Sequence, residues 1–369
     1  MTLLQHLVAK TWTELILKLG VRFALMIGAA AGAIGFALAT LELPPPPPSE
    51  RTPPEVQPAE IKPALYLSSL GELGDLRAKQ GDLVGALHAY KESLDLVRSL
   101  ARRDPENKRW EGDTSLILAR IGDLQVSRGD FSLALPAYEE SLLVAQTLAT
   151  RDPSNAQWLR EASARLEKIG ALRANMGDRT GTLAAYKTAL AISRELLRRA
   201  PDNMVWQRDV WVNLLKIADE RYAAGDRDDA AAAYNEILAH SRAMARRIPD
   251  NSEWQRYVAI SLQRMGDLRA NLGERTESLA AYEEALAIDR ALLKREPDNR
   301  QRRFDFTVSL KKVGDLHAVG GDFPNALAAY DEALTTMILA VYPDGSGATA
   351  EERSLVDSIE SARAKLPSK

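Results

Sequence analysis

Apolar and small side chains recur along most of the chain with a fixed period of 48 residues. In each copy a leucine, a glycine and a tyrosine follow one another in this order, and each of them recurs after 48 residues. Copies in a common phase indicate a repeat architecture, in which each unit buries its apolar face against its neighbours. The recurring residues are Tyr90, Tyr138, Tyr186, Tyr234, Tyr282 and Tyr330; Gly81, Gly129, Gly177, Gly225, Gly273 and Gly321; and Leu70, Leu118, Leu166, Leu214, Leu262 and Leu310.

Each copy predicts two amphipathic helices. In the second copy, residues Trp110–Ser127 carry apolar side chains such as Leu118 at helical spacing. Gly129 then ends this helix, because glycine readily takes the left-handed conformation found at helix ends. A second helix around Tyr138 stops before Pro153, which cannot continue a helix. The tryptophans near the start of the first helices are interpreted as packing residues between repeats; they are Trp110, Trp158, Trp206 and Trp254.

This pattern resembles tetratricopeptide repeats, a family of helix pairs of about 34 residues. The likeness covers residues 63–342, and each unit here is about 14 residues longer than the family norm. The resemblance implies an all-α, right-handed solenoid of six helix pairs that binds proteins, with the first helices lining a concave groove. The matching residues are Leu118, Ile121-Gly122, Gly129, Ala134, Tyr138 and Ser141 in the second copy, and Leu262, Met265-Gly266, Gly273, Ser278, Tyr282 and Ala285 in the fifth.

The segment after the repeats, residues 343–369, predicts a capping helix and a tail. Thr349 and Glu352 have the spacing of a capping box at a helix start. The sixth copy departs from the others, because Arg302 stands where the tryptophan is expected. The apolar residues expected to cover the last repeat are Leu355, Ile359, Ala362 and Leu366.

Residues 23–42 predict a transmembrane helix. From Phe23 to Leu41 the sequence holds 19 residues without a charge, and as a helix they span about 28 Å, close to the roughly 30 Å of a bilayer core. Basic residues precede this run and acidic residues follow it, so the tail 1–22 is expected in the cytoplasm and the repeats in the bacterial periplasm. A cleaved signal peptide and a buried core helix are the alternatives.

The segments around this helix carry weaker signals. The tail 1–22 has the apolar spacing of a helix lying on a membrane surface. The proline-rich residues 43–62 predict an extended spacer, with a ligand for a proline-binding domain as the alternative. Ala24, Gly28 and Gly32 form a small-residue face that favours a homodimer through this helix, unless they only reflect composition.

Composition narrows the classes of function. The chain has no cysteine, which excludes disulfides, a cysteine nucleophile and cysteine-ligated metals. The net charge is −3, and the net +2 of residues 1–22 leaves −5 for the remainder, so nucleic acid is not an expected partner. We expect no catalysis, no metal and no cofactor, because the sequence lacks a zinc-binding HExxH motif and a phosphate-binding loop. None of the four histidines, His6, His88, His240 and His317, is paired with another at metal-ligand spacing.

Two charged rows run along the predicted first helices. An acid and a base three residues apart on one helix pair with about 0.2–0.5 kcal/mol. The rows therefore form either a self-neutralised, solvated face or a groove that grips an extended peptide through alternating charges. The acidic row is Asp75, Asp123, Asp219, Asp267 and Asp315, with Ala171 in the gap, and the basic row is Arg120, Lys168, Lys216, Arg264 and Lys312, with Glu72 in the first copy.

The repeats and the expected anchor together predict a membrane-anchored, non-catalytic scaffold or adaptor that binds a protein partner, as a peptide segment or within a membrane complex. One alternative is a permanent structural subunit of such a complex, held through the transmembrane helix and the convex surface. Another is an enzyme regulator inside the cell, which requires the inverted topology.

Overall fold

The computed structural model describes residues 63–341 and 348–367. Within these ranges it holds thirteen α-helices and no strand, and none of the helices is both long and apolar enough to span a membrane. The expected tail, transmembrane helix and spacer, including Ala24, Gly28 and Gly32, lie outside the described residues. The helices are α2 (Pro63–Lys79), α3 (Leu83–Arg103), α4 (Lys108–Ser127), α5 (Phe131–Arg151), α6 (Ala156–Asn175), α7 (Arg179–Arg199), α8 (Met204–Ala224), α9 (Arg227–Arg247), α10 (Ser252–Leu272), α11 (Arg275–Arg295), α12 (Arg300–Val319), α13 (Phe323–Val341) and α14 (Ala350–Ala364).

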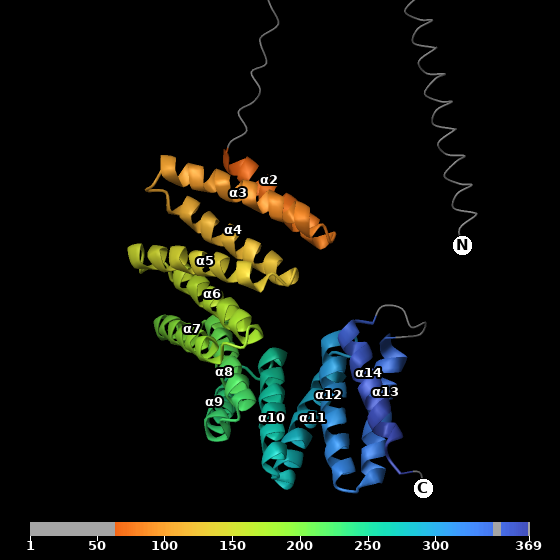
Figure 1. Cartoon of the computed structure of the whole chain (residues 1–369). Helices are drawn as coiled ribbons and strands as arrows, with labels where there is room; N and C mark the ends of the chain where they lie inside the picture. Colours follow the sequence, from red (N-terminus) through yellow and green to blue (C-terminus); the bar gives the residue numbers. More distant parts are fainter. Residues whose placement is uncertain (1–62, 342–347, 368–369) are drawn as a thin grey trace, which may run out of the picture. The chain divides into compact units, whose positions relative to one another are not determined.

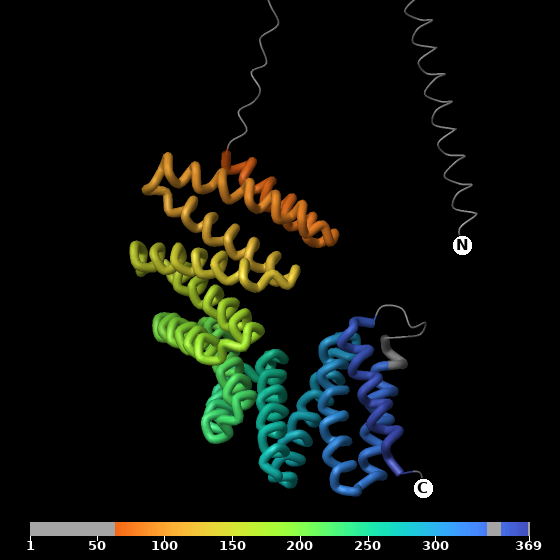
Figure 2. The backbone as a smooth tube through the Cα atoms, in the orientation of Figure 1, coloured from red at the N-terminus to blue at the C-terminus, as the bar shows by residue number. Residues whose placement is uncertain are grey.

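The helices pack in chain order, each against the next (Figure 1). The even-numbered helices α2 to α12 are the first helices of repeats 1 to 6, and the odd-numbered helices α3 to α13 are the second helices. The backbone trace follows this alternation from the orange end at α2 to the blue end at α14 (Figure 2). The prediction of an all-helical, tetratricopeptide-like repeat array is confirmed for the described residues.

Local sequence signals set the helix ends. Asn107 begins α4, and its side chain accepts a hydrogen bond from the Arg109 backbone N–H, which satisfies a donor at the helix start. Gly129 has a φ of +79°, so the predicted left-handed turn glycine is confirmed there. The same asparagine cap opens the first helix of every later repeat, at Asn155, Asn203, Asn251 and Asn299.

The core lies where the second helix of one repeat meets the first helices beside it. The Tyr138 ring packs on Gly122, where an added Cβ would stand 2.5 Å from a ring carbon. This contact explains why glycine, the residue without a Cβ, stands before the aromatic in the motif. At the next interface, Tyr90 and Leu94 of α3 share one apolar cluster with Ile121 of α4.

The two ends of the array differ. At the C-terminal end α14 closes the stack, with Ile359 fully buried and Leu355 packed beside it, and the predicted capping box of Thr349 and Glu352 is present. At the other end, α2 is the first helix that the structure describes. Leu76 is 53% exposed there, whereas its counterpart Leu124 in α4 is 4% exposed.

Candidate functional site

The acidic row predicted on the first helices is present, and each aspartate accepts a hydrogen bond within its own repeat. The Tyr138 hydroxyl donates to Asp123 over 2.6 Å, and Tyr234 donates to Asp219 over 2.7 Å. The same bond recurs in repeats 1, 5 and 6, as Tyr90 to Asp75, Tyr282 to Asp267 and Tyr330 to Asp315. The row therefore ties the first helix of a repeat to its second helix.

The basic row pairs with this acidic row, but across repeats. In each case the acid belongs to the preceding repeat: Arg120 lies 3.2 Å from Asp75, Lys168 pairs with Asp123, and Lys312 pairs with Asp267. The predicted pairing within one helix, three residues apart, is thus wrong as the general rule. It occurs only as a long 3.9 Å contact from Arg264 to Asp267, while Arg264 also reaches Asp219.

A tyrosine, an aspartate and the next repeat's base therefore form one recurring unit, which we call the inter-repeat staple. The Lys168 ammonium also lies 5.7 Å from the Tyr138 ring centroid, a cation–π contact. Burial, followed by the hydrogen bond to Asp123, raises the pKa of Tyr138 well above the ordinary tyrosine value, so the hydroxyl stays protonated and donates. Both charged partners are partly exposed, and their charges cancel.

Repeat 3 breaks the staple. Ala171 replaces the aspartate, so Tyr186 has no carboxylate to which it can donate, and Lys216 pairs instead with Glu167 over 3.0 Å. Burial, with nearby Glu220 and Glu167, raises the pKa of Tyr186 to about 12. In repeat 6, Asp315 pairs with Lys311 of its own helix over 2.6 Å.

A cleft of about 420 Å³ opens on the first helices beside this break. It is formed by α4, α6 and α8, the first helices of three consecutive repeats. Its apolar lining comes from Leu116 and Val212, and its charged lining includes three arginines and three carboxylates. The charged residues are Arg160, Arg165, Arg208, Glu161, Glu167 and Asp209.

The three arginines of the cleft have different partners. Arg160 pairs with Asp209 over 3.0 Å. Arg208 occupies the equivalent position one repeat later, where Tyr257 replaces the aspartate and accepts its hydrogen bond. Arg165 donates from Nε to the Ser141 hydroxyl over 2.8 Å. Within the described part of the chain, neither Arg165 nor Arg208 forms an ion pair.

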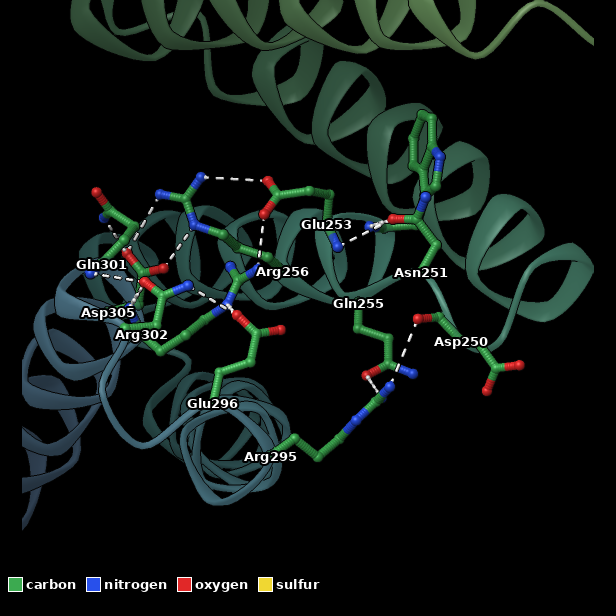
Figure 3. Close-up of polar contacts among 12 residues, drawn as sticks. Asp250, Asn251, Glu253, Gln255, Arg256, Arg295, Glu296, Gln301, Arg302 and Asp305 are labelled. Carbon is green, nitrogen blue, oxygen red and sulfur yellow. Dashed lines mark hydrogen bonds and ion pairs between the residues drawn. The ribbon is translucent and has the colours of Figure 1, made fainter.

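A second polar cluster lies between repeats 5 and 6, and sequence reasoning did not assign it a role. Arg302, in the tryptophan position, is 3% exposed and pairs with Glu253 over 2.6 Å and with Glu296 over 3.1 Å (Figure 3). Beside it, Arg256 pairs with Asp305 over 2.5 Å. The cluster shows that an arginine can replace the packing tryptophan when acids surround it.

Asp289 is the buried acid of this junction. Its carboxylate is 2% exposed and accepts a hydrogen bond of 2.7 Å from Ser309. Burial raises its pKa to about 7, against the opposing effect of the Ser309 hydrogen bond. The signal that could have found it is a break in the period, because its counterparts are Val97, Ala145, Ser193, Ser241 and Met337.

The second helices carry a further charged ladder that was missed in the sequence. Arg242 of α9 pairs with Glu284 of α11 over 2.6 Å, and Arg290 pairs with Glu332 over 2.8 Å. Equivalent pairs join Arg98 to Glu140 and Arg194 to Glu236. These pairs are exposed, so each contributes at most about 1 kcal/mol.

The contacts of Trp254 agree with the interpretation of the tryptophans as packing residues between repeats. Trp254 is 2% exposed and packs edge-on against Tyr257 and His240. His240 accordingly lies in a packing contact, and burial lowers its pKa. Among the described residues, no group of three or more His, Asp or Glu side chains is arranged to hold a metal ion. The first-helix surface offers charged and apolar side chains for contact along several repeats.

No protein-family model and no curated protein matches the chain. Among solved structures, the chain is similar to BtubC (BKLC) from P. vanneervenii, with a TM-score of 0.53 and 21% identity over 73% of this chain and 96% of that one. It is also similar to the apo form of RapI, with a TM-score of 0.54 and 14% identity over 82% of this chain and 75% of that one. At these identities the two likenesses show a shared fold.

Proposed function

We propose that this protein is a non-catalytic scaffold that binds a protein partner along its first helices. The observation that carries the proposal is the cleft formed by α4, α6 and α8. A continuous surface of side chains from consecutive helices suits an extended peptide, because each repeat contributes one contact along the length of the ligand. The tetratricopeptide-like fold supports the same function.

The aspartates of the staple are unsuitable targets for testing this proposal, because they also hold neighbouring helices together. Exchanging Asp123, Asp219 and Asp267 for lysine would remove three tyrosine hydrogen bonds and place bases beside bases, so lost binding could simply report a loosened array. Residues that line the cleft without joining the staple are better targets. Leu116 and Val212 meet this condition.

We therefore suggest affinity capture from native membranes with the full chain and with the double variant Leu116→Lys, Val212→Lys. The matched control is Leu133→Lys, Leu143→Lys, which changes two exposed leucines on the second helix α5. The proposal predicts a partner that the parent and the control capture and the cleft variant loses, with unchanged helicity in all three. Equal capture by all three proteins would refute the role of the cleft.

Membrane anchoring belongs to the same proposal and rests on the apolar run of residues 23–42. Its proposed topology places the tail in the cytoplasm and the repeats in the periplasm of a bacterial inner membrane, with a homodimer through Ala24, Gly28 and Gly32. A reporter enzyme that is active only in the periplasm, fused after residue 60, tests the topology. An inactive fusion would favour the regulator inside the cell.

A second candidate function, a permanent subunit of a membrane complex, is favoured by the open face of α2. Leu73 and Leu76 are 38% and 53% exposed, although their counterparts in repeat 2, Ile121 and Leu124, are core residues. Such a face suits a lasting apolar interface. Purification in high salt separates the candidates, because salt screens the charged contacts of the cleft and leaves an apolar interface intact.

A further inference from the structure

Arg165 is a nearly buried cation without a carboxylate partner. The residue is 7% exposed, and its only hydrogen bond among the described residues joins Nε to Ser141. Charged groups are buried in proteins when they are paired, because an unpaired one loses its hydration without compensation. The other donors of this guanidinium have no partner among the described residues and are not fully buried, so they are accessible from the cleft that Arg165 lines.

The fold does not need an arginine at this position. Its counterparts in the other repeats are neutral, and all of them lie in the same kind of helix. The nearest acids act on Arg165 only from beyond ion-pair distance, and they have other partners: Glu161 accepts from Gln157, and Asp123 belongs to a staple. The neutral counterparts are Ser69, Ile117, Asn213, Ser261 and Ser309.

The guanidinium lines the cleft between α4, α6 and α8. Arg208, the other cleft arginine without an ion pair, lines the same space, and Leu116 and Val212 provide apolar contacts beside it. A planar guanidinium presents parallel donors that match the two oxygens of a carboxylate. The cleft thus offers two such forks next to an apolar surface.

We propose that Arg165 and Arg208 anchor one carboxylate of an acidic peptide segment bound in this cleft. The proposal rests on the function proposed above and names the chemistry that the cleft recognises. A singly charged carboxylate fits better than a phosphate, because Glu161, Glu167 and Asp209 line the same cleft and would repel a dianion. The carboxylate can come from a glutamate or aspartate side chain or from a peptide C-terminus.

The test uses the full chain and fluorescein-labelled heptapeptide pools, measured by fluorescence anisotropy. The central residue is glutamate in one pool and glutamine in the other, the flanking residues are mixtures of alanine, leucine, serine and glycine, and the C-terminus is amidated. A third pool, with central glutamine and a free C-terminus, separates a terminal carboxylate from a side-chain one. The variants are Arg165→Gln and, as the control on a first helix outside both the cleft and the staple, the exposed Arg109→Gln.

We expect the parent and Arg109→Gln to bind at least one carboxylate pool about tenfold or more tightly than the amidated glutamine pool, as a charged hydrogen bond predicts. Arg165→Gln should lose this preference while keeping its helicity and melting cooperatively. Equal binding of all pools by the parent, no binding of any pool, or an unchanged preference in Arg165→Gln would overturn the inference. The affinity capture described above tests the scaffold function separately. If capture of a partner depends on the cleft but the peptide pools bind equally, the scaffold function is supported and only the carboxylate proposal fails.

Discussion

Helices α6 and α12 both bury an arginine where the other repeats have different residues, yet the two arginines have opposite surroundings. Arg302 of α12 is held by Glu253 and Glu296, whereas the one hydrogen-bond partner of Arg165 within the described ranges is Ser141. A paired buried arginine is explained by the fold alone, as part of a packed junction. The fold alone does not explain a buried arginine that has no ion pair and lines a cleft. We therefore interpret Arg302 as a structural residue and Arg165 as a ligand-binding one.

The junction of α12 also shows what the repeat does with a buried acid. Ser309 occupies the position of Arg165, and there it donates to the buried Asp289. Arg302 and Asp289 at this junction both have polar partners on neighbouring helices, whereas Arg165 of α6 lines the cleft. Substitutions at the two junctions therefore test whether their buried polar groups contribute differently to stability.

The largest effect is expected from Asp289→Asn, measured as the free energy of unfolding against pH. The folded-state pKa of about 7 lies above the unfolded value of 3.8, so the folded protein holds a proton that the unfolded chain releases. The parent should therefore lose stability as pH rises from about 4 to about 7, by roughly 2–4 kcal/mol, and the variant should not show this loss. Parallel curves for the two proteins would show that Asp289 titrates normally.

Arg302→Ala should lower the free energy of unfolding by about 2–3 kcal/mol, because it empties a buried site and separates two acids from their base. Urea denaturation measures the loss. Arg290→Ala is the control, since it removes an exposed arginine that also pairs with an acid, Glu332. A loss no larger than that of the control would mean that burial of Arg302 contributes nothing.

The smallest effect is expected from Ala171→Asp, which restores the missing staple of α6. The new carboxylate can accept from Tyr186 as Asp123 accepts from Tyr138, and we expect a gain of about 0.5–1 kcal/mol. In the background of Tyr186→Phe the gain should disappear. A gain that persists there would show that the tyrosine hydroxyl does not take part.

The sequence was sufficient for the helix pairs, the turn glycines and the C-terminal cap, because each depends on local spacing or on the period. It was not sufficient for the ion pairs. Asp123 and Lys168 are 45 residues apart, and which base meets which acid depends on the register between neighbouring helices. The spacing of three residues within one helix suggested the wrong partner for the same reason.

The residues with the most unusual environments were visible only as departures from the period. Arg165 stands among neutral counterparts and Asp289 among apolar or small ones. The sequence marks both as exceptions, but burial and partners decide what each exception means. Without the fold, Arg165 and Arg302 are two arginines in irregular positions, and nothing distinguishes them.

The most direct test compares the unfolding free energies of Arg165→Ile and Arg302→Ile with that of the parent, in the absence of any ligand. Isoleucine already occupies the Arg165 position in repeat 2, as Ile117. If Arg165 is kept for a ligand at the expense of the fold, Arg165→Ile should be about 1 kcal/mol more stable than the parent, whereas Arg302→Ile should be less stable. Loss of stability in both variants would contradict the account, because Arg165 would then be as structural as Arg302.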